Sequence, residues 1–429
     1  MGGVTAARAC AYTVVRRVFE HGAYADRAFR AEADRAELDG RDRAQAMALA
    51  YTTVQRAGTL DHLVAAFCDR PARRLEPAVL AALRLGLAQL LMLDGIAEHA
   101  AVHETVELVK RDSRGGAGLV NAVLRRAARE GRARLDALDD LTPEAAAVRH
   151  SVPLWLAQLW WAQLGSDRAR SLLATVNAPP ESALRVNTLV TTTDAITATL
   201  GVQSRPAPEL PEGLVLDGPF DVHGSESWAR GELMGQSRGS MLVARALAPH
   251  PGERVLDLCA APGAKTTHLA ALAADRSRLT AVERHPGRAR ALERTLARMH
   301  VRAARVEVRD ATASAARDPT EPYDRVLVDP PCSGLGTLQS RPDLRWRARP
   351  ERIAELAAAQ QRILVAGAEL AARDATLVYS VCTISAEESE DVVGRFLEGR
   401  PDWSQEQVRR VAPDTDGTDG FYIARLRRG

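Results

Sequence analysis

Short apolar stretches alternate with helix-like stretches over residues 236–429, and this alternation constrains the fold more than any other feature. The stretches typical of strands are Arg254–Leu258, Leu279–Val282, Ala304–Val308, Asp324–Val328 and Thr376–Val381. Helical stretches separate them at Thr266–Ala274, Gly287–Met299 and Glu351–Ala371. Such alternation predicts a mostly parallel sheet with helices on both faces, a Rossmann-like α/β domain. The tail Gly420–Leu426 is expected to close the sheet as an edge strand.

The chain ahead of this domain changes character twice. Residues 1–135 carry apolar side chains at helical spacing, as in the stripe from Leu80 to Leu91, without strand-like alternation. A helical bundle is therefore predicted there. Over residues 140–235 the helical period stops near Asn177, and a short β-branched stretch and several loop-forming prolines follow. This part is predicted to be a small mixed α+β connector domain.

Composition narrows the class of protein. The net charge is only +2 and charged residues make up 26% of the chain, so any basic surface must be local. Five scattered cysteines without a CxxC pair argue against a disulfide framework and against a thiolate zinc site. No apolar run has the length of a membrane span. We expect a cytoplasmic monomer that contacts no membrane.

The first candidate site follows the strand Arg254–Leu258, where a turn of small residues leads into a helix. The turn residues are Cys259, Ala260, Ala261, Pro262, Gly263, Ala264 and Lys265. Small residues let a ligand approach the backbone, and the helix N-terminus offers free N–H groups. The turn is not a phosphate-binding P-loop, because Ala264 stands where that motif needs glycine. Glu283 follows 20 residues after Gly263, the spacing at which a carboxylate binds ribose hydroxyls in dinucleotide sites.

Four successive strands end in a polar or reactive residue. These residues are Glu283, Asp310, Asp329 and Cys382. Ligands of open α/β sheets bind outside the carboxyl ends of the strands, so the four side chains are expected to meet in one crevice. Two prolines stiffen the turn between Asp329 and a further cysteine, Cys332.

These motifs resemble those of a known family. Cys259–Lys265, Asp329–Gly334 and Ser380–Thr383 are similar to motifs of the RNA cytosine-5 methyltransferases that use S-adenosylmethionine. Residues 1–135 resemble a NusB-type RNA-binding domain, and Leu184–Thr188 resembles the stretch ahead of the catalytic domain. The whole order resembles the bacterial 16S ribosomal RNA cytosine-5 methyltransferases with an N-terminal NusB-like domain.

The resemblance implies a role for each candidate residue. Cys259 to Lys265 would line the S-adenosylmethionine site, with Glu283 on the ribose and Asp310 near the adenine. Asp329 would lie between cofactor and target base. Cys382 would be the nucleophile, and Cys332 would assist product release. Ribosomal RNA, 16S in particular, is the implied partner.

Chemistry agrees with these roles. Addition of a thiolate to C6 of cytosine makes C5 nucleophilic enough to take a methyl group. Because a free thiol is mostly protonated at neutral pH, we expect Lys265, one of only two lysines in the chain, to favour the thiolate. One alternative concerns which thiol attacks. DNA cytosine-5 methyltransferases use a cysteine that follows a proline, as Cys332 does here, and this chain has Val381 where the RNA family usually has threonine.

Two further departures and several secondary candidates follow from the sequence. Ala264 stands where the family usually has glycine, and a positive φ there would be strained; Ser237, where an aspartate is usual, receives no role. His99 and His103 lack a third ligand, so no metal site is predicted. The residues expected to contact RNA are Arg125, Arg126 and Arg129, and Arg341, Arg345 and Arg347 around Trp346.

The interpretation is therefore an S-adenosylmethionine-dependent RNA cytosine-5 methyltransferase. Two alternatives stay open: the same chemistry on transfer RNA, and a non-catalytic RNA-binding assembly factor that keeps only the fold. Joint retention of Lys265, Asp329, Cys332 and Cys382 speaks against the second alternative.

Overall fold

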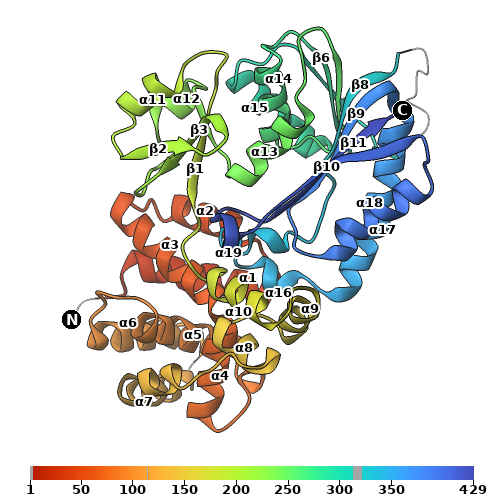
Figure 1. Ribbon diagram of the computed structural model, residues 1–429. Helices are drawn as coiled ribbons and strands as arrows, with labels where there is room; N and C mark the ends of the chain where they lie inside the picture. The colour runs from red at the N-terminus through yellow and green to blue at the C-terminus, as the bar shows by residue number, and fades with distance from the viewer. Residues whose placement is uncertain (1–2, 114, 313–320) are drawn as a thin grey trace. The chain divides into compact units, whose positions relative to one another are not determined.

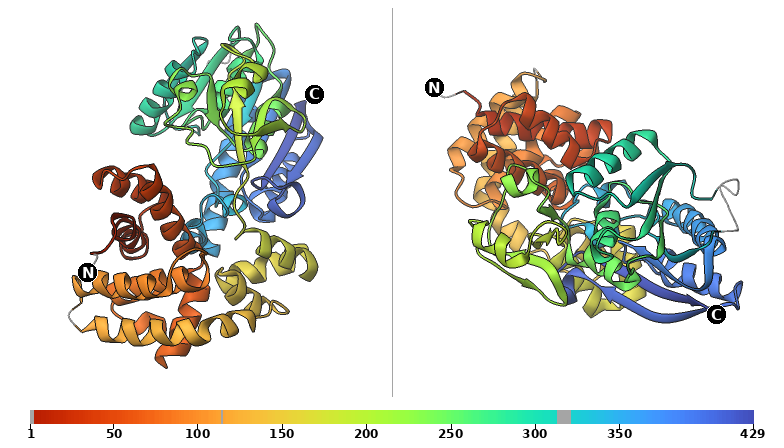
Figure 2. Two further views of the ribbon diagram at one scale, coloured as in Figure 1. Left: turned by 90° about the vertical axis from the view of Figure 1, so that its left-hand side faces the viewer. Right: turned by 90° about the horizontal axis from the view of Figure 1, so that it is seen from above.

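The computed structural model describes residues 3–113, 115–312 and 321–429, and the chain divides into two compact units. The first unit runs to Ala178 and includes the later segment Leu338–Arg347. The second unit contains Pro179–Thr337 and Ala348–Gly429. Figure 1 labels many of the helices and strands of both units, and Figure 2 gives two further views. Within the described residues, no helix combines the length and the apolar character that crossing a membrane requires.

The first unit is helical, which confirms the helical character predicted for residues 1–135. It extends to Ala178 and so includes three helices of the stretch 140–235 that was expected to form the connector. Its helices are α1 (Ala6–His21), α2 (Ala25–Arg35), α3 (Gly40–Gln55), α4 (Ala57–Cys68), η1 (Ala72–Arg74), α5 (Pro77–Leu91), α6 (Glu98–Lys110), α7 (Gly116–Asp136), α8 (Pro143–His150), α9 (Leu154–Leu164) and α10 (Ser166–Thr175). Helix α5 is buried on nearly all sides, which explains its apolar composition. Gly86 of α5 lets α7 approach closely, because a Cβ there would lie 2.6 Å from Leu124 Cδ1.

The second unit begins with a small antiparallel sheet. Its strands are β1 (Ser182–Val186), β2 (Ser204–Ala207), β3 (Leu210–Leu216) and β4 (Leu233–Gly235), in the order β2-β3-β1-β4. Helices α11 (Thr193–Thr199) and α12 (Glu226–Ala229) lie between them in the chain. The predicted α+β character of this part is confirmed.

The larger sheet of this unit has seven strands. They are β5 (Arg254–Asp257), β6 (Arg278–Glu283), β7 (Ala304–Val308), β8 (Tyr323–Val328), β9 (Ala371–Val381), β10 (Trp403–Val411) and β11 (Phe421–Arg428), in the order β10-β11-β9-β8-β5-β6-β7. Strands β5 to β9 pair in parallel, and β10 and β11 pair antiparallel. The predicted Rossmann-like sheet is therefore confirmed.

Helices cover both faces of this sheet (Figure 1). Buried residues of α13 (Arg238–Leu247), α14 (Ala264–Leu272) and α15 (Pro286–Arg298) share one core cluster with residues of one sheet face. Buried residues of α17 (Pro350–Leu370) and α18 (Glu390–Glu398) share a cluster with the other face. The remaining short helices are η3 (Leu335–Thr337), α16 (Leu344–Arg347), η4 (Ala386–Glu388) and α19 (Pro413–Asp416).

One prediction about the sheet is wrong. The tail strand β11 lies between β9 and β10 rather than at the edge. The edge strand is β10, which the sequence pattern missed. Most of its side chains between Ser404 and Arg410 are exposed or half-buried and polar, so the apolar alternation that reveals a strand is absent there.

The structure of the segment Leu338–Arg347 contradicts the prediction that Arg345 contacts RNA. Arg345 is fully buried and donates only to oxygens of neutral groups within the first unit. Its acceptors are the carbonyls of Gln55, Ser151, Val176 and Leu338 and the side-chain oxygen of Asn177, at 2.9–3.2 Å. Trp346 packs against the helical core and donates its indole N–H to Val54 O at 2.7 Å. Arg345 and Trp346 are thus anchors of the fold, because the bundle offers unpaired carbonyls that only a buried fork of donors satisfies.

We expect replacement of Arg345 to lower the stability of the first unit. Arg345→Met leaves several buried carbonyls without a donor, and each costs about 1–3 kcal/mol. We expect the free energy of unfolding to fall by about 3 kcal/mol or more, measured by urea unfolding. The exposed Arg341, four residues earlier, gives the control Arg341→Met. Equal stability of the two variants would contradict the anchor role.

Candidate functional site

The turn after β5 carries the first group of predicted residues. Gly263 has φ +109°, a conformation that other residues rarely adopt, and caps α14. A Cβ at Gly263 would lie 2.8 Å from Leu292 Cδ1, so the turn also needs glycine for space. Ala264 is the first residue of α14 and has no positive φ. The strain considered for Ala264 therefore does not occur, because the left-handed position falls one residue earlier.

A cavity of about 360 Å³ brings three predicted cofactor residues together. Cys259, Glu283 and Asp310 line it from the ends of β5, β6 and β7, and apolar side chains of α17 such as Leu356 and Ile363 form the facing wall. Ala260–Lys265 and Asp329 do not line this cavity. The lining also includes Arg284, Arg288, Arg352 and Arg362, so the cavity combines carboxylates and guanidinium groups with apolar side chains.

The acids of the cavity are held by local contacts. Glu283 is 3% exposed, accepts the backbone N–H of His285 at 2.9 Å and pairs with Arg288 at 3.4 Å. Asp310 accepts the hydroxyl and the backbone N–H of Thr312, and these hydrogen bonds lower the pKa of Asp310. Burial and the surrounding carboxylates raise the pKa of the Cys259 thiol, which makes it a poor nucleophile.

Lys265 and Asp329, which do not line this cavity, form an ion pair with each other. The distance from Lys265 Nζ to Asp329 Oδ2 is 2.7 Å, and Ser380 donates its hydroxyl to Asp329 Oδ1 at 2.8 Å. Lys265 also lies over the ring of Phe421, 5.3 Å from its centroid. Burial lowers the pKa of Lys265, but the charge of Asp329, their hydrogen bond and the nearby Cys382 outweigh it, so the pKa lies above its ordinary value. The ammonium therefore stays charged within reach of both an acid and a thiol.

The two cysteines of the strand ends lie side by side. Cys332 Sγ is 3.3 Å from Cys382 Sγ, and both side chains are partly buried. Their hydrogen bond and burial raise the pKa of Cys332 well above that of a free thiol, with contributions from Glu388 and Asp329. Cys332 is thus held as a thiol that can donate to Cys382. The structure brings Cys332, Cys382, Asp329 and Lys265 into one group. Of the four strand-end residues expected in one crevice, Asp329 and Cys382 belong to this group, whereas Glu283 and Asp310 line the cavity.

Other contacts at this edge of the sheet were not predicted. Ser380, quoted in the motif without a role, orients Asp329. Glu388 contacts Ser333 and Thr383, the residues that follow the two cysteines, and Gln360 contacts Pro331, the residue before Cys332. A glutamate in the run Ala386–Glu388 looks solvent-exposed in the sequence, and only the tertiary structure reveals that Glu388 is fully buried.

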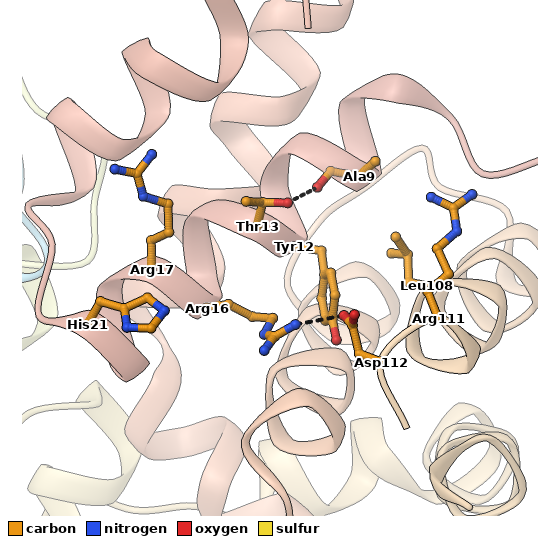
Figure 3. A pocket seen from close by; sticks show the side chains of 9 residues that line it. All are labelled: Ala9, Tyr12, Thr13, Arg16, Arg17, His21, Leu108, Arg111 and Asp112. Carbon is orange, nitrogen blue, oxygen red and sulfur yellow. Dashed lines mark hydrogen bonds and ion pairs between the residues drawn. The ribbon is translucent and has the colours of Figure 1, made fainter. Parts of the chain in front are cut away.

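The first unit contains two further hollows. A wide groove of about 1360 Å³ between α6 and α7 is lined by His99, His103, Lys110, Arg125 and Arg129 among others. Arg126, predicted to share their role, does not line the groove; it pairs with Glu130 at 3.1 Å. A cavity of about 390 Å³ beside α1 and α6 (Figure 3) contains Arg16, which pairs with Asp112 at 2.7 Å. None of the predicted catalytic or cofactor residues belongs to these hollows.

Comparison with known proteins identifies the family. A model described as 16S rRNA methyltransferase RsmB/F matches residues 244–427, the NusB family matches residues 5–129, and an RsmF/B-like ferredoxin-like domain matches residues 152–223. The probable ribosomal RNA small subunit methyltransferase B of Synechocystis is 34% identical, over 98% of this chain and 99% of the relative. The chain belongs to the RsmB/F methyltransferase family.

Further relatives of the RsmB/F family agree. The Bacillus subtilis protein named probable ribosomal RNA small subunit methyltransferase B is 32% identical over 99% of both chains. The crystal structure of a methyltransferase homologue from Pyrococcus horikoshii matches with a TM-score of 0.60 and 26% identity, over 67% of this chain and all of that one. The family resemblance of the motifs and the NusB-like nature of the N-terminal helices are therefore confirmed.

The buried Asp257 at the end of β5 should make the stability of the protein depend on pH. Burial raises its pKa to about 7, although Thr266 donates to it at 2.8 Å. Between pH 4 and 7 the unfolded chain has lost this proton while the native protein keeps it, so rising pH favours unfolding by up to about 1.4 kcal/mol per pH unit.

Asp257→Asn removes this dependence. Urea unfolding should show that the variant gains stability relative to wild type as the pH rises from about 4 to about 7. The exposed Asp391 gives the control Asp391→Asn, whose difference from wild type should not change in this way. A constant difference between Asp257→Asn and wild type across this range would be evidence against a raised pKa.

Proposed function

We propose that this enzyme transfers a methyl group from S-adenosylmethionine to C5 of a cytidine in 16S ribosomal RNA through a covalent Cys382–C6 adduct. The observation that carries the proposal is the 3.3 Å approach of Cys332 and Cys382 at the same sheet edge as the Lys265–Asp329 ion pair. Membership of the RsmB/F family supports methyl transfer. The names of the relatives support ribosomal RNA of the small subunit over transfer RNA.

The cavity beside the cysteines fits S-adenosylmethionine. Glu283 offers a buried carboxylate to ribose hydroxyls, Asp310 lies at the next strand end, and the apolar wall of α17 suits the flat face of an adenine. The missing side chain of Gly263 keeps the adjoining turn tight. When bound, the cofactor supplies an electrophilic methyl group. A solved structure described as NSun6 from Pyrococcus horikoshii with SFG shares the fold, with a TM-score of 0.59 and 23% identity over 64% of this chain and 98% of its own.

The protein side of the reaction begins at Cys382. Its thiolate attacks C6 of the cytosine, which makes C5 nucleophilic, and negative charge develops toward N3. The ammonium of Lys265, which donates to Asp329 across 2.7 Å, is suited to stabilise that charge. After methyl transfer the C5 proton leaves to a base and the Cys382–C6 bond breaks. Cys332, whose pKa is raised, holds a proton next to the departing sulfur.

The same environment favours Cys382 over Cys332 as the nucleophile. Cys332 has its pKa raised by its hydrogen bond to Cys382 and by burial, with the charges of Glu388 and Asp329 adding to the effect. Lys265 is the cation close to Cys382. A thiol that is hard to ionise is a poor attacking group, so Cys332 suits assistance in release.

Replacement of each cysteine tests the assignment. With RNA that contains 5-fluorocytosine, which cannot lose a proton from C5, we expect Cys332→Ala to form a covalent adduct and Cys382→Ala to form none. Denaturing gels and mass spectrometry measure the adduct. The reverse pattern would assign the attack to Cys332, and absence of any adduct in wild type, together with no cofactor binding by calorimetry, would favour a non-catalytic RNA-binding factor.

Lys265→Arg tests the need for a compact cation. A guanidinium spreads its charge and cannot occupy the ammonium's place between Asp329 and Phe421, so turnover should fall by about tenfold or more. The other lysine, Lys110, is exposed and pairs with Glu107, which makes Lys110→Arg the matched control. Methyl transfer from a radiolabelled donor measures both. Near-normal turnover of Lys265→Arg would refute the role of the ammonium.

A further inference from the structure

Glu388, at the end of η4, is a fully buried acid that the proposed reaction does not use. The hydrogen bonds that its carboxylate accepts come from neutral donors rather than from a lysine or arginine. Burying a carboxylate among neutral groups is costly unless its oxygens are well satisfied. Its position therefore needs an explanation beyond simple packing.

The carboxylate of Glu388 joins the two cysteine-bearing turns. Oε1 accepts the backbone N–H of Ser333, the residue after Cys332, at 2.8 Å. Oε2 accepts the hydroxyl of Thr383, the residue after Cys382, at 3.2 Å, and also the hydroxyl of Ser333. The two hydroxyls are themselves 2.8 Å apart. One side chain thus contacts the neighbours of both sulfur atoms.

A second layer fixes Glu388 in turn. Gln360 of α17 is fully buried and donates from Nε2 to Glu388 Oε1 and to Pro331 O, at 3.0 Å each. The hydroxyl of Tyr379 lies 2.6 Å from Glu388 O and 3.1 Å from Gln360 Oε1. The turn of Cys332 is therefore held through Pro331 and Ser333, on both sides of the cysteine.

We propose that Glu388 is a positioning residue that fixes the separation of Cys332 and Cys382. Its role in catalysis rests on the proposed function, whereas its effect on the two sulfur atoms does not. A carboxylate suits this position because its two oxygens only accept, and Ser333, Thr383 and Gln360 all approach them as donors. An amide would turn one oxygen into a donor facing other donors.

The charge of Glu388 has a second consequence. It contributes to raising the pKa of Cys332, after the hydrogen bond to Cys382 and burial. Glu388 thereby helps to hold Cys332 as a thiol while the cation of Lys265 lies near Cys382. The side chain of Glu388 thus both fixes the positions of the two cysteine-bearing turns and raises the pKa of Cys332.

The first test is Glu388→Gln, which keeps the shape of the side chain. We expect kcat and the rate of adduct formation on RNA containing 5-fluorocytosine to fall by about tenfold or more, because small displacements of reacting groups are costly. KM for both substrates should change by less than about threefold, because the substituted group touches neither. The adjacent Glu387 is exposed, so Glu387→Gln is the matched control and should behave as wild type.

The second test measures the two sulfur atoms without any methyl transfer. Diamide takes two hydrogens from a pair of close thiols and leaves a disulfide, which mass spectrometry detects as a linked Cys332–Cys382 peptide. Wild type and Glu387→Gln should form the link rapidly, and Glu388→Gln at least about tenfold more slowly. Ser333→Ala removes the hydroxyl contacts to Glu388 and Thr383 but keeps the backbone N–H contact to Glu388, so it should give an intermediate rate. This variant serves as the test if Glu388→Gln does not fold.

The outcomes separate the two proposals. A wild-type enzyme without methyltransferase activity would overturn the proposed function, while the linking rates would still decide the role of Glu388. Unchanged linking in both Glu388→Gln and Ser333→Ala would overturn the positioning role. So would a Glu388→Gln enzyme with normal kcat. Glu388→Asp, which keeps the charge on a shorter stem, should recover part of the linking rate.

Discussion

The parallel pairing of β8 with β9 is the constraint on which the site depends. In their register Val328 lies opposite Tyr379, so Asp329 leaves β8 beside Ser380 and Cys382 follows two residues further. Strand β5 pairs with β8 on the other side, with Asp257 opposite Leu327. Because these strands run in one direction, their following turns all leave from the same edge of the sheet. A shift of one residue in this pairing would turn alternate side chains to the opposite face.

At the edge of the sheet where β5, β8 and β9 end, carboxylates lie close together and one ammonium offsets only part of their negative charge. Asp257 and Asp329 lie near a single ammonium, Lys265, and burial, with a smaller contribution from the charge of Asp329, raises the pKa of Asp257 to about 7. Separate carboxylates without a nearby cation would be harder to keep ionised at this depth. Under the proposed function, the Lys265–Asp329 ion pair stabilises the negative charge that develops on the base. The stability that the fold loses by burying Asp257 is therefore lost at the same edge of the sheet where the chemistry is proposed.

The sequence predicted those parts of the molecule that local patterns encode. Runs of apolar residues predicted β5 to β9, and the residue that ends each strand predicted the group around Asp329 and Cys382. Patterns of this kind fail where distant parts of the chain decide the environment. Arg345 looks like a surface cation beside other arginines, yet its acceptors include Gln55, 290 residues away. Strand β10 is polar and at the sheet edge, so its alternation carries no apolar signal.

The two thiols illustrate why geometry matters more than motif. Sulfur atoms 3.3 Å apart in a partly buried site do not both ionise readily, because the first negative charge raises the pKa of the second group. Which thiol ionises then depends on the asymmetry around the pair. The carboxylate of Glu388 contacts the residues after both cysteines, Ser333 and Thr383, whereas the ammonium of Lys265 acts on Cys382. A motif in which cysteine follows proline is compatible with either thiol as the nucleophile, so the proposed attack by Cys382 rests on the nearby ammonium of Lys265 rather than on the motif.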